Sequence, residues 1–168
     1  MLPACFKQAK GKSEPIFGEK LYDAIIVYSP NDKDKALNFL SSLKRDILRD
    51  ENCFQIALFD DPRISSINEA FQTSSVAFVL LTKDFCECDW PGFSSNQVVM
   101  ESLYTKTPCT IVPVILPNEF GGNMFKIPMG LKCMKQLRLN FEDELVRESV
   151  SRFLTLKIRQ RLSKMMEV

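Results

Sequence analysis

Three uninterrupted apolar runs place the strongest constraint on how this chain folds. They span residues 24–28, 76–81 and 110–116 and are rich in valine and isoleucine. A strand with one face in water alternates apolar and polar residues, so runs without alternation predict strands that are covered on both faces. Such strands are typical of parallel sheets that pack between two layers of helices.

Weaker patterns between these runs predict the remaining elements. Residues 32–50 carry apolar side chains at helical spacing and predict a helix whose stripe comprises Ala36, Leu37, Phe39, Leu40, Leu43 and Ile47. The other predicted elements are a strand at 54–59, a helix at 66–74, a helix at 95–105, an edge strand at 136–140 and a helix at 142–165. The last helix has a stripe of Val146, Val150, Phe153, Leu154, Ile158 and Leu162. The stretch 82–93, which contains proline and glycine, is predicted to be a turn-rich connection.

The order of these elements predicts an α/β fold. Strands and helices alternate along the chain, so we expect a flavodoxin-like three-layer α/β/α arrangement with a five-stranded parallel sheet. Residues 1–20 lack periodicity and are predicted to be a disordered leader or linker, followed by one domain over 21–168. Pro113 lies inside the third run, and we expect it where the sheet needs no N–H donor.

The short helix at 66–74 has a start signal of its own. Ser66 is followed three residues later by Glu69, which predicts a capping box. In such a box the serine hydroxyl accepts a bond from the backbone of residue 69, and the glutamate reaches back toward the helix start. The loop 60–66 therefore ends at a defined position.

The composition excludes several classes of function. The 168 residues include no histidine, which excludes catalysis by a Ser–His pair and histidine-ligated zinc. The six glycines form neither a dinucleotide-binding motif nor a P-loop. With 22 basic and 21 acidic residues, nucleic acid is not an expected partner. No stretch is apolar enough for a signal peptide or a membrane span, so we expect a cytoplasmic protein with reduced, mostly buried cysteines.

Neither a metal site nor a phosphoacceptor site is predicted. Cys86 and Cys88 are one residue apart, whereas structural zinc sites use wider gaps and a second pair of ligands. Asp60 and Asp61 follow the second strand in a Pro-containing segment that is typical of a turn. A phosphoacceptor would need an acidic pair after the first strand and a lysine after the last, and the chain matches neither requirement.

Three stretches and one aromatic residue resemble features of the Toll/interleukin-1 receptor (TIR) domain family. Residues 22–29, Tyr-Asp-Ala-Ile-Ile-Val-Tyr-Ser, are similar to the first signature box of that family. Residues 60–63, Asp-Asp-Pro-Arg, stand where the family has its BB loop, and 111–116 resemble its fourth strand with an internal proline. Phe153 stands where the third box has an aromatic residue. The likeness spans 21–162, and residues 75–85, 96–98 and 152–165 are most similar to cytosolic adaptors of the TRIF and TRAM kind.

The resemblance implies a signalling scaffold of innate immunity. Such a protein relays Toll-like receptor or similar signals through association of TIR domains, with no covalent chemistry and no cofactor. Its partners would be other TIR domains or further copies of the same chain, in dimers or open assemblies. The contact residues implied in the BB loop and on the neighbouring helix are Asp60, Asp61, Pro62, Arg63, Ile64 and Gln97.

The family also includes enzymes, which leaves an alternative open. Some TIR domains resemble glycosidases in cleaving NAD, as a substrate, with one glutamate that is usually four residues after a tryptophan. Four residues after Trp90 this chain has Ser94, and the first glutamate beyond it is Glu101. The alternative function is therefore an NAD hydrolase that uses Glu101 to stabilise an oxocarbenium-like transition state.

Overall fold

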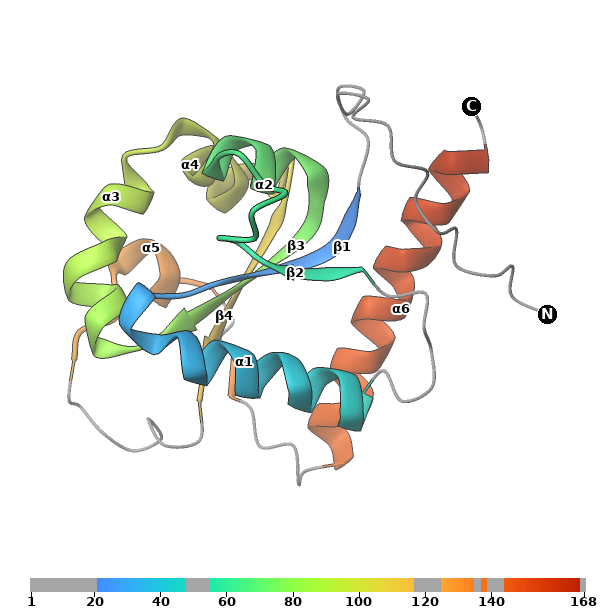
Figure 1. The fold of residues 1–168 in the computed structure, drawn as a ribbon, viewed down its shortest axis with the longest axis horizontal. Coiled ribbons are helices and arrows are strands. Elements are labelled where there is room, and N and C mark those ends of the chain that lie inside the picture. The colour runs from blue at the N-terminus through green and yellow to red at the C-terminus, as the bar shows by residue number, and fades with distance from the viewer. Residues whose placement is uncertain (1–20, 48–54, 117–124, 135–136, 139–143, 167–168) are drawn as a thin grey trace.

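The computed structural model describes residues 21–47, 55–116, 125–134, 137–138 and 144–166, which form a three-layer α/β/α fold (Figure 1). A parallel five-stranded sheet in the order β2–β1–β3–β4–β5 is the middle layer. Its strands are β1 (Tyr22–Val27), β2 (Ile56–Leu58), β3 (Ser74–Leu81), β4 (Thr110–Ile115) and β5 (Leu137–Arg138). The predicted fold class is confirmed.

Helices of unequal length connect the strands. They are α1 (Lys33–Ser42), α2 (Ile67–Thr73), α3 (Trp90–Ser94), α4 (Gln97–Thr105), α5 (Met129–Lys132) and α6 (Glu144–Met166). A 3-10 turn at Pro30–Asp32 leads into α1. One π-helical turn, Leu43–Ile47, follows α1, and another, Phe85–Asp89, precedes α3. The predicted helix over 32–50 is therefore α-helical only to Ser42, and residues 48–50 lie outside the described part.

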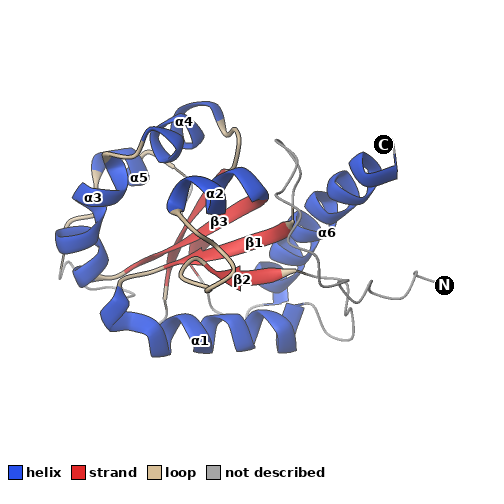
Figure 2. Cartoon of the chain, turned by 45° about the horizontal axis from the view of Figure 1, so that its top comes forward, coloured by secondary structure: helices blue, strands red, loops and turns tan. Residues whose placement is uncertain are grey.

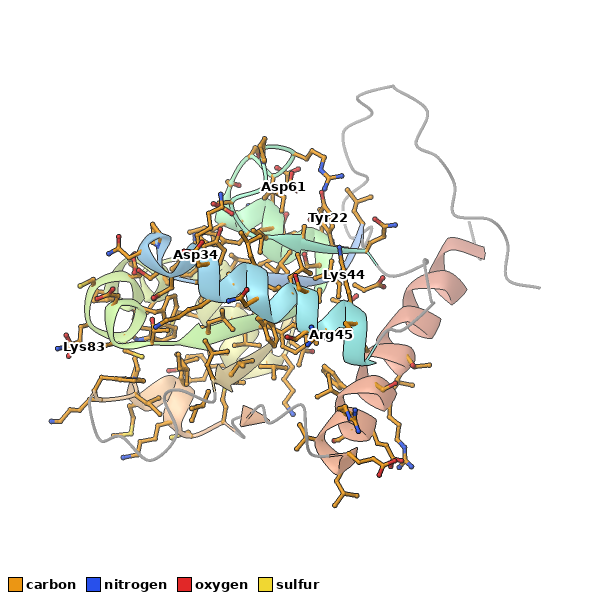
Figure 3. The ribbon with its side chains drawn as sticks, turned by 60° about the horizontal axis from the view of Figure 1, so that its bottom comes forward. Tyr22, Asp34, Lys44, Arg45, Asp61 and Lys83 are labelled. Atoms are coloured by element: carbon orange, nitrogen blue, oxygen red, sulfur yellow. The ribbon has the colours of Figure 1, made fainter. Side chains whose placement is uncertain are left out.

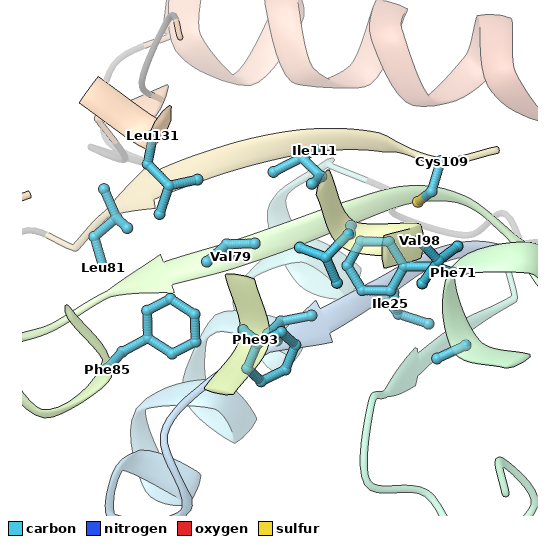
Figure 4. Packing of buried hydrophobic residues seen from close by; sticks show 14 of the residues in the cluster. Ile25, Phe71, Val79, Leu81, Phe85, Phe93, Val98, Cys109, Ile111 and Leu131 are labelled. Atoms are coloured by element: carbon cyan, nitrogen blue, oxygen red, sulfur yellow. The ribbon is translucent and has the colours of Figure 1, made fainter. Parts of the chain in front are cut away.

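Both faces of the sheet are covered, which explains the apolar runs. Ile25 and Val79 belong to a hydrophobic cluster with buried residues of α2, α3, α4 and α5 (Figure 4). Ile26 and Phe78 point to the opposite face, where their cluster includes buried residues of α1 and α6. Neighbouring residues of a strand point to opposite faces of the sheet. When both faces are covered, every residue of the strand is buried, so apolar residues do not alternate with polar ones.

The long last helix packs as its pattern predicts. Val150 and Leu154 are buried in the cluster that α6 shares with α1, and Val146 and Phe153 pack against it. The side chains of Ile158 and Leu162 lie outside the described part.

Pro113 occupies a position that the sheet tolerates. Its partner in the register with β3 is Val79. On the other side, the described pairing of β4 with β5 begins one residue later, between Val114 and Leu137. The described ladder between β4 and β5 therefore does not require the N–H donor that proline lacks.

Three local predictions need correction. Leu37 does not widen the buried stripe of α1, because it is 43% exposed while Ala36 and Phe39 are buried. The stretch 82–93 is largely helical rather than turn-rich, since it contains a π-helical turn and most of α3. The helix predicted over 95–105 begins only at Gln97.

Two further predictions lie partly or wholly outside the described residues. The edge strand predicted over 136–140 contains β5, but residues 136 and 139–140 lie outside the described part. The leader predicted over 1–20 also lies outside it.

Candidate functional site

Polar side chains gather where β1, β2 and β3 end. The carboxyl ends of parallel strands lie at the same edge of a sheet, and that edge is where sites form in folds of this class. Tyr28 and Asp32 follow β1, Asp60 follows β2 and Thr82 follows β3. They form two hydrogen-bonded pairs, one between Tyr28 and Asp60 and one between Asp32 and Thr82.

The first pair holds the start of the 60–66 loop, the segment between β2 and α2 (Figure 2). The hydroxyl of Tyr28 donates to Oδ1 of Asp60 at 2.6 Å. On the other side of the carboxylate, Nζ of Lys33 lies 3.8 Å from Oδ2. Burial raises the pKa of Tyr28 well above its usual value, and the bond to Asp60 raises it further. The phenol therefore remains a protonated donor, so residues that follow β1 anchor the first residue of the loop.

Asp61 closes the middle of the loop. Its Oδ1 accepts from the backbone N–H of Arg63 at 2.9 Å and from Nε of the same residue at 3.0 Å, and its Oδ2 accepts from Nη2 at 2.8 Å. Its backbone carbonyl accepts from the N–H of Ile64 at 2.8 Å. The side-chain bond to Arg63 lowers the pKa of Asp61 below its usual value, and the same bond raises the pKa of Arg63.

The end of the loop is fixed by the start of α2. Ser66 is the N-cap and accepts from the backbone N–H of Glu69 at 3.1 Å, which confirms one half of the predicted capping box. The carboxylate of Glu69 does not reach Ser66 but accepts from the N–H of Ser65 at 2.8 Å and from its hydroxyl. The bonds from Ser65, chiefly from its hydroxyl, lower the pKa of Glu69.

The predicted contact residues differ in how much they expose. Asp60, Pro62 and Arg63 are exposed, whereas Asp61 is half-buried. Ile64 is also half-buried and packs against the hydrophobic cluster beneath the loop. Tyr22, in β1, lies near enough to the loop for the charge of Arg63 to oppose the rise in its pKa that burial causes (Figure 3). The loop therefore presents its tip to solvent and keeps an apolar residue underneath.

Gln97 and Glu101 belong to another element and lie on the outward face of α4. Val98, Val99 and Ser102 are buried, whereas Gln97 and Glu101 are one helical turn apart and exposed. Within the described part of the chain, no side chain binds the carboxylate of Glu101. The helix itself begins at Asn96, whose Oδ1 accepts from the N–H of Val98 at 3.1 Å.

The position that the enzymatic pattern would use carries a hydroxyl. Ser94 lies four residues after Trp90, is half-buried, and donates from its hydroxyl to the carbonyl of Pro91 at 3.3 Å. A hydroxyl at this position has no negative charge with which to stabilise an oxocarbenium ion.

Two buried carboxylates lie outside the set of predicted contact residues. Asp32 is 7% exposed; its Oδ2 accepts from the hydroxyl of Thr82 at 2.6 Å, and Nζ of Lys35 lies 3.4 Å from its Oδ1. Asp23, the acidic residue of the first signature box, is fully buried and accepts from the N–H of Gln55 at 2.9 Å. For Asp23 the available signal is its position next to the apolar run 24–28, because a carboxylate beside a buried segment needs donors from neighbouring segments.

The described residues offer no cluster for a metal ion. No group of three or more cysteine, aspartate or glutamate side chains among them is arranged to hold one. Cys86 and Cys109 are buried, but Cys88 and Cys133 are exposed, so the expectation of mostly buried cysteines holds for only half of those described. In the part of the chain that the structure places, no helix is long and apolar enough to cross a membrane.

Comparison with known proteins supports the fold. No protein-family model matches the chain, and no curated protein matches it in sequence. Among solved structures, it is similar to a metazoan TIR-STING receptor from C. gigas, with a TM-score of 0.52 and 19% sequence identity. The likeness covers 83% of this chain but only 43% of the receptor chain. At that identity the comparison shows a TIR-like fold and leaves the activity to be inferred from the residues.

Proposed function

We propose that this chain is a TIR-type signalling scaffold that associates with other TIR domains, or with its own copies, through the 60–66 loop. In this role it relays Toll-like receptor or similar innate immune signals in the cytoplasm and needs no cofactor. The TRIF and TRAM type of adaptor is the branch that residues 75–85 and 96–98 resemble. A TIR-like fold shared with a receptor supports this class of function.

The observation that carries the proposal is an exposed tip on a loop whose conformation is fixed. Pro62 and Arg63 lie in solvent, while Asp60, Asp61 and Glu69 hold the loop at its start, middle and end. A loop that is ordered before it binds loses less conformational entropy on association. Contact residues are therefore presented at little additional cost.

Arg63 retains donors for a partner. Its Nε and Nη2 bind Asp61, and no described residue binds its Nη1. Arginine is enriched among the residues that dominate interface energies because its planar head combines hydrogen bonding with stacking. The carboxylate of Asp60 lies at the start of the same loop, so the two signs of charge are close together on one surface. Such a surface suits head-to-tail contacts that build open assemblies from individually weak interactions.

The test is self-association of loop variants. Arg63→Ala and Pro62→Ala are expected to abolish association or filament growth in sedimentation and electron microscopy, with little change in melting temperature. Arg152→Ala is the matched control, because Arg152 is also an exposed arginine beside a carboxylate, with Nη2 3.9 Å from Oε2 of Glu148 on α6. If both loop variants associate like the unchanged protein, the 60–66 loop is not the docking element.

The NAD-cleaving alternative rests on Glu101 alone. That carboxylate stands on an exposed helix face, whereas glycosidic-bond cleavage relies on carboxylates positioned against the substrate within a site. The geometry of the described residues therefore favours the scaffold.

A further inference from the structure

The start of the 60–66 loop differs from an ordinary exposed turn because the hydroxyl of a buried residue, Tyr28, donates a hydrogen bond to it. Tyr28 is 1% exposed, and the residue to which it donates, Asp60, has a side chain that is 43% exposed. The two residues are 32 positions apart in the sequence. The bond therefore connects the interior at the end of β1 to the first residue of the docking loop.

The ring that carries this hydroxyl is fixed in place. Tyr28 and Phe59 pack edge to face, with ring centroids 5.3 Å apart and planes at 80°. Phe59, the residue before the loop, packs in the same manner on Phe93 of α3, at 5.6 Å and 65°. Aromatic pairs at such distances favour this arrangement, so a change in the position of one ring disturbs the next. The hydroxyl of Tyr28 is thus a fixed point relative to the sheet.

The other contact of Asp60 is weaker. Lys33 is 3.8 Å away, and both partners are substantially exposed to water. Exposed ion pairs contribute little because water and salt screen them. A short hydrogen bond from a buried donor to a carboxylate is stronger, so Tyr28 is the main restraint on Asp60.

We propose that Tyr28 is a positioning residue of the docking loop: its hydroxyl sets where the loop begins and thereby controls the strength of association without touching the partner. This inference rests on the proposed function. It assigns separate tasks to one side chain, since the ring supports the core while the hydroxyl orients Asp60 and the residues after it.

The test removes one hydroxyl at each of two equivalent bonds. Tyr28→Phe removes the donor to Asp60, and Thr82→Val removes the donor to Asp32, where the bond is also 2.6 Å long. Thr82 is buried and its hydroxyl additionally accepts from the N–H of Phe85 at 3.2 Å. Thr82→Val is therefore the control for a loss of stability that leaves the docking loop untouched.

The two variants are expected to have opposite profiles: Tyr28→Phe should change the docking loop more, and Thr82→Val should change the melting temperature more. Tyr28→Phe should weaken self-association on the order of tenfold and raise amide hydrogen exchange at Arg63 and Ile64 by a similar factor. Thr82→Val should lower the melting temperature more than Tyr28→Phe does and leave both loop readouts unchanged. Asp60→Asn keeps an acceptor oxygen and should retain the amide protection, whereas Asp60→Ala should lose it as Tyr28→Phe does.

The outcomes separate the two proposals. If Arg63→Ala abolishes association but Tyr28→Phe changes neither association nor loop exchange, the positioning role is wrong and the docking loop stands. If the unchanged protein associates neither with itself nor with other TIR domains at any concentration, the proposed function fails. In that case, amide hydrogen exchange in the monomer still tests the role of Tyr28. If Tyr28→Phe leaves the protection of the Arg63 and Ile64 amides unchanged, the positioning role is wrong.

Discussion

The 60–66 loop and the outward face of α4 differ in how their charged groups are held. In the loop, every carboxylate has a partner: Asp60 binds Tyr28, Asp61 binds Arg63, and Glu69 of the adjoining helix binds Ser65. On α4, Glu101 projects into solvent with no described side chain bound to it. The carboxylates of the loop are thus held in place by hydrogen bonds, whereas the carboxylate of Glu101 is not held by any described side chain.

The two helices next to these regions begin in different ways, which makes the comparison testable. The cap of α2 is reinforced by the ionisable Glu69, whereas the cap of α4 is the neutral Asn96. The helices α2 and α4 also pack against each other. Changes in pH or charge are therefore expected to act on the loop and spare its neighbour.

After the loss of association expected from Arg63→Ala and Pro62→Ala, the next largest effect is expected from Asp61→Ala. This change removes every side-chain acceptor that holds Arg63, so the guanidinium and the loop backbone lose their fixed conformation. Association should weaken by about 10- to 100-fold in sedimentation experiments, because bonds to charged groups are the stronger kind. The free energy of unfolding should fall by less than about 1 kcal/mol, since Arg63 is exposed and water screens its bonds to Asp61.

Asp61→Asn provides the matched control for that change. It keeps an oxygen that can accept from the N–H of Arg63 but loses the charge, so we expect an effect between those of the unchanged protein and Asp61→Ala. Equal association by Asp61→Ala and the unchanged protein would remove the distinction between the loop and α4.

A smaller effect is expected from acidification. The pKa values of Asp61 and Glu69 lie below their ordinary values of 3.8 and 4.5 in the folded protein. A lowered carboxyl pKa contributes stability that is complete above the ordinary value and is lost as the pH falls through the folded value. The loop should therefore lose its bonds only below these ordinary values, as protons bind to the two carboxylates.

Nuclear magnetic resonance can follow this loss at single amides. The N–H signals of Arg63 and Ser65 should shift with acidification, whereas the N–H of Val98, which is bound by the neutral Asn96, should not. A shift of all three signals with one midpoint would indicate global unfolding and contradict a separate response of the loop.

Much of the fold follows from local sequence, and the exceptions share a cause. The apolar runs predict the central strands because burial on both faces leaves its pattern in consecutive residues, and Ser66 identifies a helix start three residues from its partner. The helical segment before α4 does not follow from the sequence, because its Pro- and Gly-containing stretch shows no regular apolar period. Phe85 and Phe93 are instead held there by packing in the core (Figure 4).

The candidate site was only partly predictable for a related reason. The residues of the 60–66 loop could be named because a Pro-containing acidic turn stands after a strand, but their bonds could not. The bond from Tyr28 to Asp60 spans 32 positions and that from Thr82 to Asp32 spans 50. Such pairs are set by the order of strands in the sheet, which a periodic pattern does not specify.

The smallest effect is expected from Glu101→Gln. This exposed residue has no described side-chain partner, and surface substitutions of that kind change stability by less than about 0.5 kcal/mol. Association should match that of the unchanged protein if docking resides in the loop. Incubation of either protein with NAD should release no nicotinamide above background. If the unchanged protein releases nicotinamide and Glu101→Gln does not, the conclusion is reversed. The function would then be NAD cleavage by a carboxylate of α4, and the loop would have a supporting role.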